Sequence, residues 1–216
     1  MKNKFIKFIK QKNFEGTKEL HHKYISNYYA NEFYVKREEE LIFVEIGVRD
    51  GFDLAMFADW FYKSKVFGID ITEIVETHSA SPSYSPEFGW GRYDLSIGEL
   101  DNCHFINGNG YDDSIINFFK DETIDYLIDD ASHLLKHQLM CIEKYLSKIK
   151  KGGKIIIEDV GCDEPTIFCK LGNPSPNECI ESIVNKAEQL GCMVRVFNLS
   201  EITKIKYSII IEITKR

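Results

Sequence analysis

Residues 41–48 (Leu-Ile-Phe-Val-Glu-Ile-Gly-Val) form an apolar run that a single acid, Glu45, interrupts. Runs of this kind are typical of strands that are buried on both faces, because helices cover both sides of the sheet. Similar short runs follow along the chain, at residues 65–70, 104–107, 124–129 and 154–159. Segments with helical periodicity separate them. Strands that alternate with helices in this way predict an α/β fold with a Rossmann-like, doubly wound and mostly parallel sheet.

The remaining segments complete a seven-stranded sheet and add a helical cap. Two further strands are expected at 193–198 and 207–214, and the helices of the main domain at 54–62, 114–120, 134–149 and 176–190. Apolar residues at spacings of three and four predict amphipathic helices in residues 1–40. We therefore divide the chain into this N-terminal cap and a main domain, residues 41–216.

One connection in the main domain, residues 72–102, is too long for an ordinary loop. Long ordered loops at the carboxyl ends of strands commonly bind ligands or cover them. We expect this insert to be a lid or a substrate element. Its aromatic candidates for stacking on a substrate are Tyr84, Phe88, Trp90 and Tyr93.

Charge and cysteine content exclude several classes of protein. The chain of 216 residues has 27 basic and 34 acidic residues, so it lacks the excess of positive charge that nucleic-acid binding favours. Its six cysteines are scattered without a Cys-x-x-Cys pair, which favours reduced thiols and a cytoplasmic location over a disulfide framework. No apolar run reaches the length of a membrane span. The apolar N-terminal helices suggest a homodimer in which they cover the neighbouring subunit.

Acidic residues stand at the ends of three predicted strands, where ligands bind in open α/β sheets. Glu45 begins an E-x-G-x-x-x-G pattern with Gly47 and Gly51, which has one glycine fewer in its turn than the G-x-G-x-x-G dinucleotide fingerprint. A glycine there lets backbone amides approach a ligand. Asp70 ends the next strand and is placed to accept the hydroxyls of a ribose. Together these features predict a ligand that contains adenosine.

The sequence around these acids is similar to known motifs. Residues 43–51 (FVEIGVRDG) and 67–70 (FGID) resemble motif I and the following acidic strand end of class I S-adenosylmethionine-dependent methyltransferases. Residues 129–133 (DDASH) and 152–159 (GGKIIIED) resemble the D-D-G-S-H and G-G-x-x-x-I-E-D signatures of a narrower family. That family is the metal-dependent sugar O-methyltransferases of macrolide biosynthesis, the macrocin and mycinamicin type.

The resemblance also extends upstream and has two departures. His22-Lys23-Tyr24, with Tyr28-Tyr29, is similar to an H-x-Y...Y segment that precedes motif I in related proteins. Ala131 stands where the family has glycine, and the 72–102 insert diverges, so the acceptor does not follow from the resemblance.

The resemblance implies a role for each group of residues. The S-adenosylmethionine pocket would contain Glu45, Gly47, Gly51, Asp70, Gly108, Asn109 and Asp129. A divalent cation, usually magnesium, would be bound by Asp130, Glu158 and Asp159, whose oxygens are the ligands that hard cations prefer. The catalytic residues would be Asp130 and His133, with His133 as the general base.

Simpler interpretations exist for the same residues. Aspartate is a favoured helix N-cap, a histidine in the first turn of a helix is commonly packed or solvated, and Asn109 lies between two glycines, as in a turn. A cation is favoured because two pairs of acids at adjacent strand ends repel each other unless positive charge lies between them.

The predicted reaction is methyl transfer to a hydroxyl of a small sugar-containing substrate. Vicinal sugar hydroxyls suit a cation that lowers the pKa of an alcohol and orients it. Such a substrate would be a nucleotide-activated sugar, a surface-glycan precursor or a glycosylated natural product. The alternatives are a methyltransferase for a phenolic or other small-molecule hydroxyl without metal, a nicotinamide-dependent oxidoreductase, and a noncatalytic S-adenosylmethionine-binding protein. The missing glycine argues against the oxidoreductase.

Overall fold

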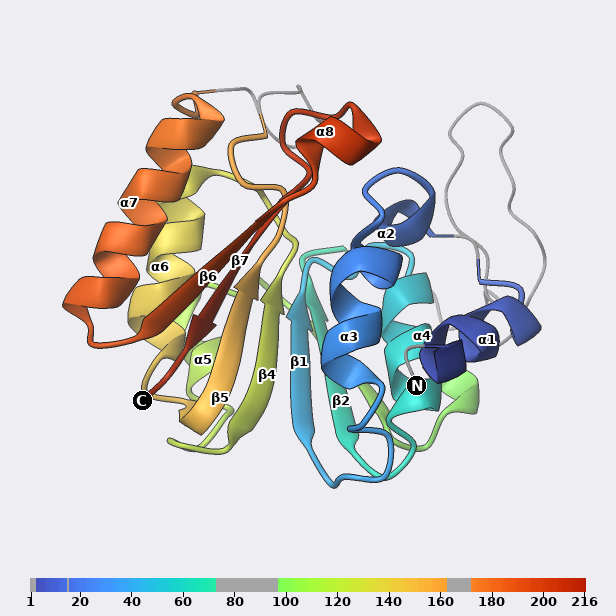
Figure 1. The fold of residues 1–216 in the computed structure, drawn as a ribbon. Coiled ribbons are helices and arrows are strands. Elements are labelled where there is room, and N and C mark those ends of the chain that lie inside the picture. Colours follow the sequence, from blue (N-terminus) through green and yellow to red (C-terminus); the bar gives the residue numbers. More distant parts are fainter. Residues whose placement is uncertain (1–2, 15, 73–96, 163–171) are drawn as a thin grey trace.

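The fold is a single seven-stranded sheet with helices on both faces (Figure 1). The computed structural model describes residues 3–14, 16–72, 97–162 and 172–216. The strand order is β3-β2-β1-β4-β5-β7-β6; β1 to β5 pair in parallel, and β7 is antiparallel to both of its neighbours. The strands are β1 (Ile42–Ile46), β2 (Lys65–Asp70), β3 (Cys103–Asn107), β4 (Ile124–Asp129), β5 (Ile149–Ile157), β6 (Met193–Asn198) and β7 (Ile209–Thr214). The predicted Rossmann-like, mostly parallel sheet is confirmed.

Two apolar cores lie on opposite faces of this sheet. One joins the N-terminal elements and α4 to the sheet, and the other joins the sheet to α5, α6 and α7. The N-terminal elements are α1 (Asn3–Gln11), α2 (Thr17–Leu20), the π-helical turn η1 (Ile25–Tyr29) and α3 (Ala30–Phe33). The others are α4 (Phe52–Trp60), the 3₁₀ turn η2 (Ile97–Glu99), α5 (Asp113–Ile116), α6 (Leu135–Tyr145), α7 (Pro176–Gln189) and α8 (Ser200–Thr203).

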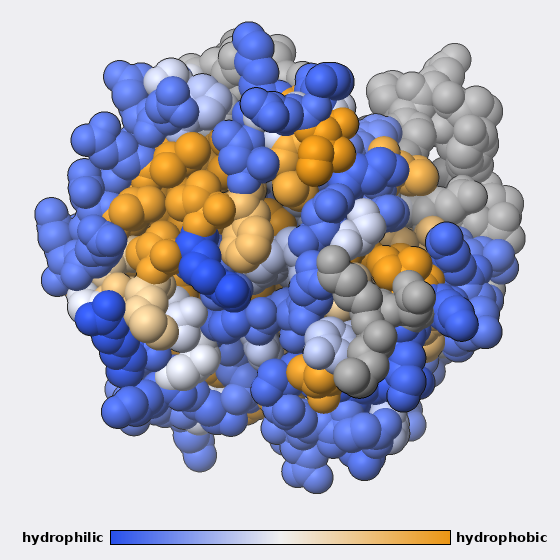
Figure 2. All heavy atoms as spheres, viewed as in Figure 1, coloured by the Kyte–Doolittle hydropathy of each residue, from blue (hydrophilic) through white to orange (hydrophobic). Residues whose placement is uncertain are grey.

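The apolar side of the N-terminal cap packs within its own chain. Phe5 and Phe8 are buried and contact the indole of Trp60 edge-on, with ring centroids 4.7 and 5.2 Å apart. These side chains are therefore not available to cover a neighbouring subunit, and the structure gives no support for a homodimer formed through the cap. Exposed large apolar side chains include Leu20 and Val35 of the cap as well as Met193 and Val196 of the edge strand β6. Figure 2 shows an apolar area at the left of the view.

The carboxyl-terminal half differs from the sequence prediction in detail. The helix expected at 134–149 ends at Tyr145, and β5 already begins at Ile149, before Gly152 and Gly153. The two glycines fall between the helix and the strand that the sequence predicts, but they lie inside an irregular strand where the β4–β5 register shifts. A Cβ atom on Gly153 would lie 2.9 Å from the carbonyl oxygen of Ile124, so the close approach of two backbones explains this glycine. The short helix α8 was not predicted.

Other predictions fall partly outside the described residues. Most of the 72–102 insert, with its four aromatic candidates, lies there. Among the described residues, Cys103, Cys141, Cys179 and Cys192 are free thiols. Among the described helices, none has the length and apolar character that crossing a membrane requires.

Candidate active site

The alternation of side chains along three neighbouring strands brings three acids to one face of the sheet. Glu45 in β1 pairs with Ile128 in β4, and Ile128 pairs with Ile156 in β5. Because side chains two residues apart share a face, Asp130 and Glu158 follow on the same side as Glu45, beyond the ends of β4 and β5. This is the side that the N-terminal cap covers.

Lys18 of α2 reaches this group of acids from the cap. Its Nζ lies 2.5 Å from Asp130 Oδ2, 2.5 Å from Glu158 Oε2 and 3.4 Å from Glu45 Oε1, and the side chain is 2% exposed. Burial alone would lower the pKa of Lys18, but the charges of Asp130, Glu158 and Glu45 raise it well above its ordinary value. The ammonium is therefore a permanent charge in the site, although no pattern in the sequence indicated it.

Carboxyl groups outnumber the single ammonium of Lys18 in this region. Burial raises the pKa of Glu45 to about 8, although the charge of Lys18 opposes the shift. Burial likewise raises the pKa of Asp53 to about 6 and that of Glu158 above its ordinary value. One lysine does not offset the cost of burying so many carboxylates, so protons or a bound cation have to neutralise the others.

Three aromatic residues of the cap also bind the acids. Tyr24 Oη donates a hydrogen bond of 2.6 Å to Asp159 Oδ1, and Tyr29 Oη donates one to Glu158 Oε1. His22 Nδ1 lies 3.4 Å from Asp159 Oδ1. The upstream segment that resembles H-x-Y...Y thus lies directly on the predicted cation ligands.

Asp130, His133 and Asp159 form the group of side chains best placed to bind a cation. One donor atom from each lies within 4.8 Å of the others, and all three are partly accessible, with 21%, 18% and 13% of their side chains exposed. His133 Nδ1 is 4.0 Å from Asp130 Oδ1 and has no hydrogen-bond partner among the described residues. This mixed oxygen and nitrogen set suits a divalent cation. Glu158 does not belong to it.

Asp129 points to the opposite face from Asp130. Its Oδ1 accepts a hydrogen bond of 2.7 Å from Tyr111 Oη, and its Oδ2 is buried without a hydrogen-bond partner in the described part of the chain. Burial raises the pKa of Asp129. The ring of Tyr111 stacks on His137, whose Nδ1 is 2.6 Å from Ser132 Oγ. His137 therefore packs against Tyr111, the residue that donates a hydrogen bond to Asp129.

The predicted cofactor residues surround the turn after β1. Gly47 has a left-handed φ of 88°, and a Cβ atom there would lie 2.3 Å from the carbonyl oxygen of Asp130. Asp70 accepts hydrogen bonds of 2.8 Å from the backbone amides of Arg49 and Thr72, one on each carboxylate oxygen. Each oxygen keeps a second lone pair for a ribose hydroxyl.

The other cofactor candidates have clear local roles. Gly51 precedes α4 with a left-handed φ of 76°, and the Gly108 amide donates to the carbonyl oxygen of Asp70. The Asn109 side chain donates a hydrogen bond of 2.9 Å to Asp112 Oδ1 and accepts one from the backbone amide of Tyr111. It therefore stabilises the turn after β3. The geometry at Asn109 thus matches the simpler interpretation.

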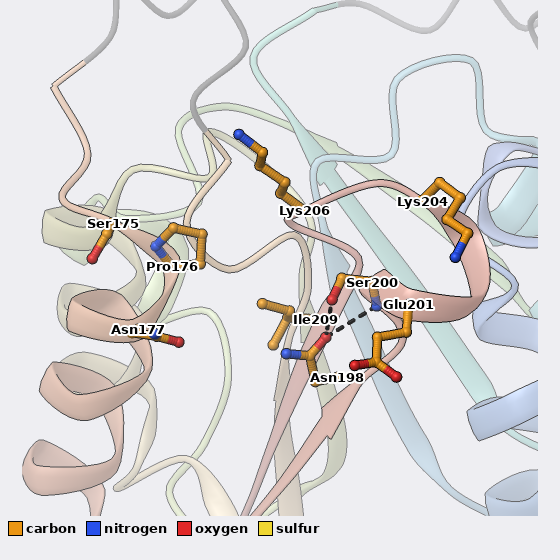
Figure 3. A pocket seen from close by; sticks show the side chains of 9 residues that line it. All are labelled: Ser175, Pro176, Asn177, Asn198, Ser200, Glu201, Lys204, Lys206 and Ile209. Atoms are coloured by element: carbon orange, nitrogen blue, oxygen red, sulfur yellow. Dashed lines mark hydrogen bonds between the residues drawn. The ribbon is translucent and has the colours of Figure 1, made fainter.

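An open pocket of about 430 Å³ lies between the start of α7 and the β6–α8–β7 segment. Figure 3 shows its lining: Ser175, Pro176, Asn177, Asn198, Ser200, Glu201, Lys204, Lys206 and Ile209. Asn198 Oδ1 accepts hydrogen bonds from the amide and the hydroxyl of Ser200.

The strand order, with its antiparallel β7, and the acids at the carboxyl ends define the class I methyltransferase fold. Solved structures bear this out. The chain superposes with a TM-score of 0.61 on the MycE methyltransferase from the mycinamycin biosynthetic pathway, determined with Mg, SAH and mycinamycin VI; identity is 19% over 89% of this chain and 49% of that one. The protein thus spans about half the length of MycE. The resemblance expected from the motifs is confirmed at the level of fold.

Further solved structures have a similar fold. A SAM-dependent methyltransferase from Aquifex aeolicus matches with 17% identity and a TM-score of 0.54, over 97% of this chain and 96% of that one. The Methanococcus jannaschii fibrillarin pre-rRNA processing protein matches with 15% identity and a TM-score of 0.56, over 82% and 67%. No protein-family model and no curated protein matches the sequence.

Proposed function

We propose that the protein is an S-adenosylmethionine-dependent O-methyltransferase that acts on a sugar hydroxyl with the help of a divalent cation. The observation that carries the proposal is the group formed by Asp130, His133 and Asp159 next to the turn after β1. The likeness to MycE, whose structure contains Mg, SAH and mycinamycin VI, supports the combination of cofactor, cation and sugar-bearing acceptor.

The chain's own residues define the donor side of this site. S-adenosylmethionine supplies an electrophilic methyl group on a positively charged sulfur. Asp70 accepts the ribose hydroxyls through the lone pairs that its backbone bonds leave open. Asp129 has a buried Oδ2 without a hydrogen-bond partner among the described residues, and a carboxylate there favours positive charge near it. Gly47 lets the backbone after β1 pass Asp130 without a clash.

On the acceptor side, a bound divalent cation supplies charge that lowers the pKa of a hydroxyl and orients it. Asp130 and Asp159 hold that cation in the proposal. His133 was predicted to accept the proton of the hydroxyl, and its ring is next to Asp130. The same imidazole is also placed to bind the cation, and Nδ1 can serve only one of the two roles.

The pocket between α7 and the β6–α8–β7 segment supports an acceptor that carries phosphate. Lys204 and Lys206 line it together with one acid, Glu201, and the first turn of α7 lines the opposite side. Positive side chains and a helix N-terminus favour anionic groups. A nucleotide-activated sugar is therefore our preferred acceptor class, and the free thiols make the cytoplasm the proposed compartment.

The first test is calorimetric titration of the protein with S-adenosylhomocysteine and, separately, with NAD⁺. Binding of the first ligand alone is expected; binding of NAD⁺ alone would favour the oxidoreductase instead. The second test follows transfer of labelled methyl to nucleotide sugars and to catechol, with and without a chelator. Transfer to catechol that the chelator leaves unchanged would support the metal-free alternative and contradict the sugar proposal.

A further inference from the structure

Of the predicted cation ligands, Glu158 has both carboxylate oxygens in contact with other side chains of the protein. Oε2 lies 2.5 Å from Lys18 Nζ, and Oε1 accepts a hydrogen bond from Tyr29. Both Lys18 and Glu158 are almost completely buried. A metal ion at Glu158 would have to displace this buried ammonium, which would leave the ammonium without its partner. The positive partner of Glu158 is therefore Lys18.

Asp130 faces two cationic positions at once. Its Oδ2 binds Lys18, while its Oδ1 lies on the side of His133, 4.0 Å from Nδ1. The third donor comes from Asp159, and the three donor atoms lie within 4.8 Å of one another. Donors around one ion at about 2.0–2.2 Å are about 3–4 Å apart, so small rotations of these side chains complete the site.

The backbone holds two of these ligands in unusual conformations. His133 and Asp159 have left-handed φ angles of 56° and 52°, which are uncommon for residues other than glycine. Asn173 stabilises the backbone at His133, because its side-chain amide donates a hydrogen bond of 2.8 Å to the carbonyl oxygen of His133. His133 Nδ1 is left buried, facing Asp130, without a hydrogen bond from the described residues. A cation would satisfy this nitrogen.

We infer that the cation is bound by Asp130, His133 and Asp159, and that Lys18 permanently replaces it at Glu158. The inference rests on the proposed function and changes the ligand set, since His133 then acts as a ligand rather than as a base. An imidazole nitrogen among the donors favours first-row transition ions, whereas Mg²⁺ prefers oxygen. The site accordingly selects Mn²⁺ over Mg²⁺.

Pulsed EPR of the full chain loaded with one equivalent of Mn²⁺ tests this inference, because a bound imidazole gives a ¹⁴N modulation. Three variants are compared with the parent: His133→Gly, which suits the left-handed φ, Glu158→Gln, which keeps the shape of the side chain, and His22→Ala. Manganese affinity is measured by titration, circular dichroism checks the fold, and titration with S-adenosylhomocysteine on the same samples tests the proposed function separately.

We expect a ¹⁴N signal in the parent that His133→Gly removes, together with at least about tenfold weaker Mn²⁺ binding. Glu158→Gln and His22→Ala should keep the signal, and equimolar Mg²⁺ should not displace Mn²⁺. The inference is overturned if the parent binds no Mn²⁺ or shows no ¹⁴N signal, or if the signal survives in His133→Gly. It is also overturned if Glu158→Gln weakens binding as much as His133→Gly does. Binding of S-adenosylhomocysteine in any of these cases leaves the cofactor proposal standing.

Discussion

Lys18 Nζ and Glu158 Oε2 lie 2.5 Å apart in the interior, although the two residues are 140 positions apart in the chain. The contact joins the short helix α2 of the cap to the carboxyl end of β5. It therefore makes the N-terminal segment part of the candidate site and not only a cover for it. The cost of burying Glu158 is offset only when α2 is docked, so cap docking and the ionisation of the site are linked.

Replacement of Lys18 by methionine should strongly destabilise the protein. The substitution keeps the apolar part of the side chain but leaves Asp130, Glu158 and Glu45 without their ammonium. Breaking a buried ion pair in this way costs about 3–5 kcal/mol. Urea unfolding near neutral pH measures the change.

Lys12→Met is the matched control for that substitution. Lys12 pairs with Asp59 at 3.0 Å from a partly exposed position, where an ion pair contributes at most about 1 kcal/mol. Equal effects of the two substitutions would show that Lys18 does not stabilise the buried acids.

The sequence predicted the acids of the site but not the residue that partners them. Strand ends could be located because apolar runs and acids are local patterns. The repulsion between neighbouring acid pairs even required positive charge between them, which was assigned to a metal ion. The structure supplies part of that charge from Lys18, which stands in a short polar segment (TKELHHK) where a lysine normally faces solvent. Only the docking of α2 reveals its partner.

Strand alternation predicts that Asp129 and Asp130 point to opposite faces of the sheet, but it does not predict which residues they contact. Adjacent residues at a strand end point to opposite faces, so one aspartate had to face the cap and the other the helices behind the sheet. The hydrogen bond from Tyr111 to Asp129 depends on the turn after β3 and on α6. Such contacts between distant segments leave no periodic signal in the sequence.

The stability of the protein should fall with rising pH because of Glu45. Burial raises the pKa of this carboxyl from 4.5 to about 8. The folded protein therefore holds a proton that the unfolded chain releases, and the contribution is fully present below about pH 4.5 and lost toward about pH 8. The slope from one such group approaches about 1.4 kcal/mol per pH unit.

Glu45→Gln removes this titration. The difference in free energy of unfolding between the variant and the parent should grow in favour of the variant between about pH 5 and about pH 8. Glu188→Gln, at an exposed position of α7, should leave the pH dependence unchanged. Parallel curves for Glu45→Gln and the parent would contradict the prediction.

Asp70→Asn should weaken binding of S-adenosylhomocysteine without unfolding the protein. Asparagine keeps one acceptor oxygen. Its NH₂ group replaces the other carboxylate oxygen of Asp70 and therefore faces a backbone N–H that this oxygen binds in the parent. Loss of a hydrogen bond to a charged group corresponds to about 1.5–3 kcal/mol, or roughly 10- to 150-fold in affinity. Titration calorimetry measures it, with Asp50→Asn on the neighbouring exposed turn as the control. Unchanged affinity in Asp70→Asn would remove Asp70 from the cofactor pocket.

Gly47→Ala should disrupt the turn after β1 through backbone strain and through a steric clash. Gly191→Ala is the control that separates these two effects. Gly47 and Gly191 have similar left-handed φ angles, 88° and 78°. A Cβ atom at Gly191 meets nothing within 4 Å, so Gly191→Ala carries only the backbone strain, about 1–2 kcal/mol. A Cβ atom at Gly47 would lie 2.3 Å from the carbonyl oxygen of Asp130, so β1 and β4 must separate.

We therefore expect Gly47→Ala to lower the free energy of unfolding by at least about 1 kcal/mol more than Gly191→Ala does. It should also abolish binding of S-adenosylhomocysteine, because the displaced turn carries the amide of Arg49 that holds Asp70. Thermal unfolding and calorimetric titration measure the two effects. Equal losses of stability in the two variants, with ligand binding intact in Gly47→Ala, would mean that the close approach of Gly47 to Asp130 does not shape the cofactor site.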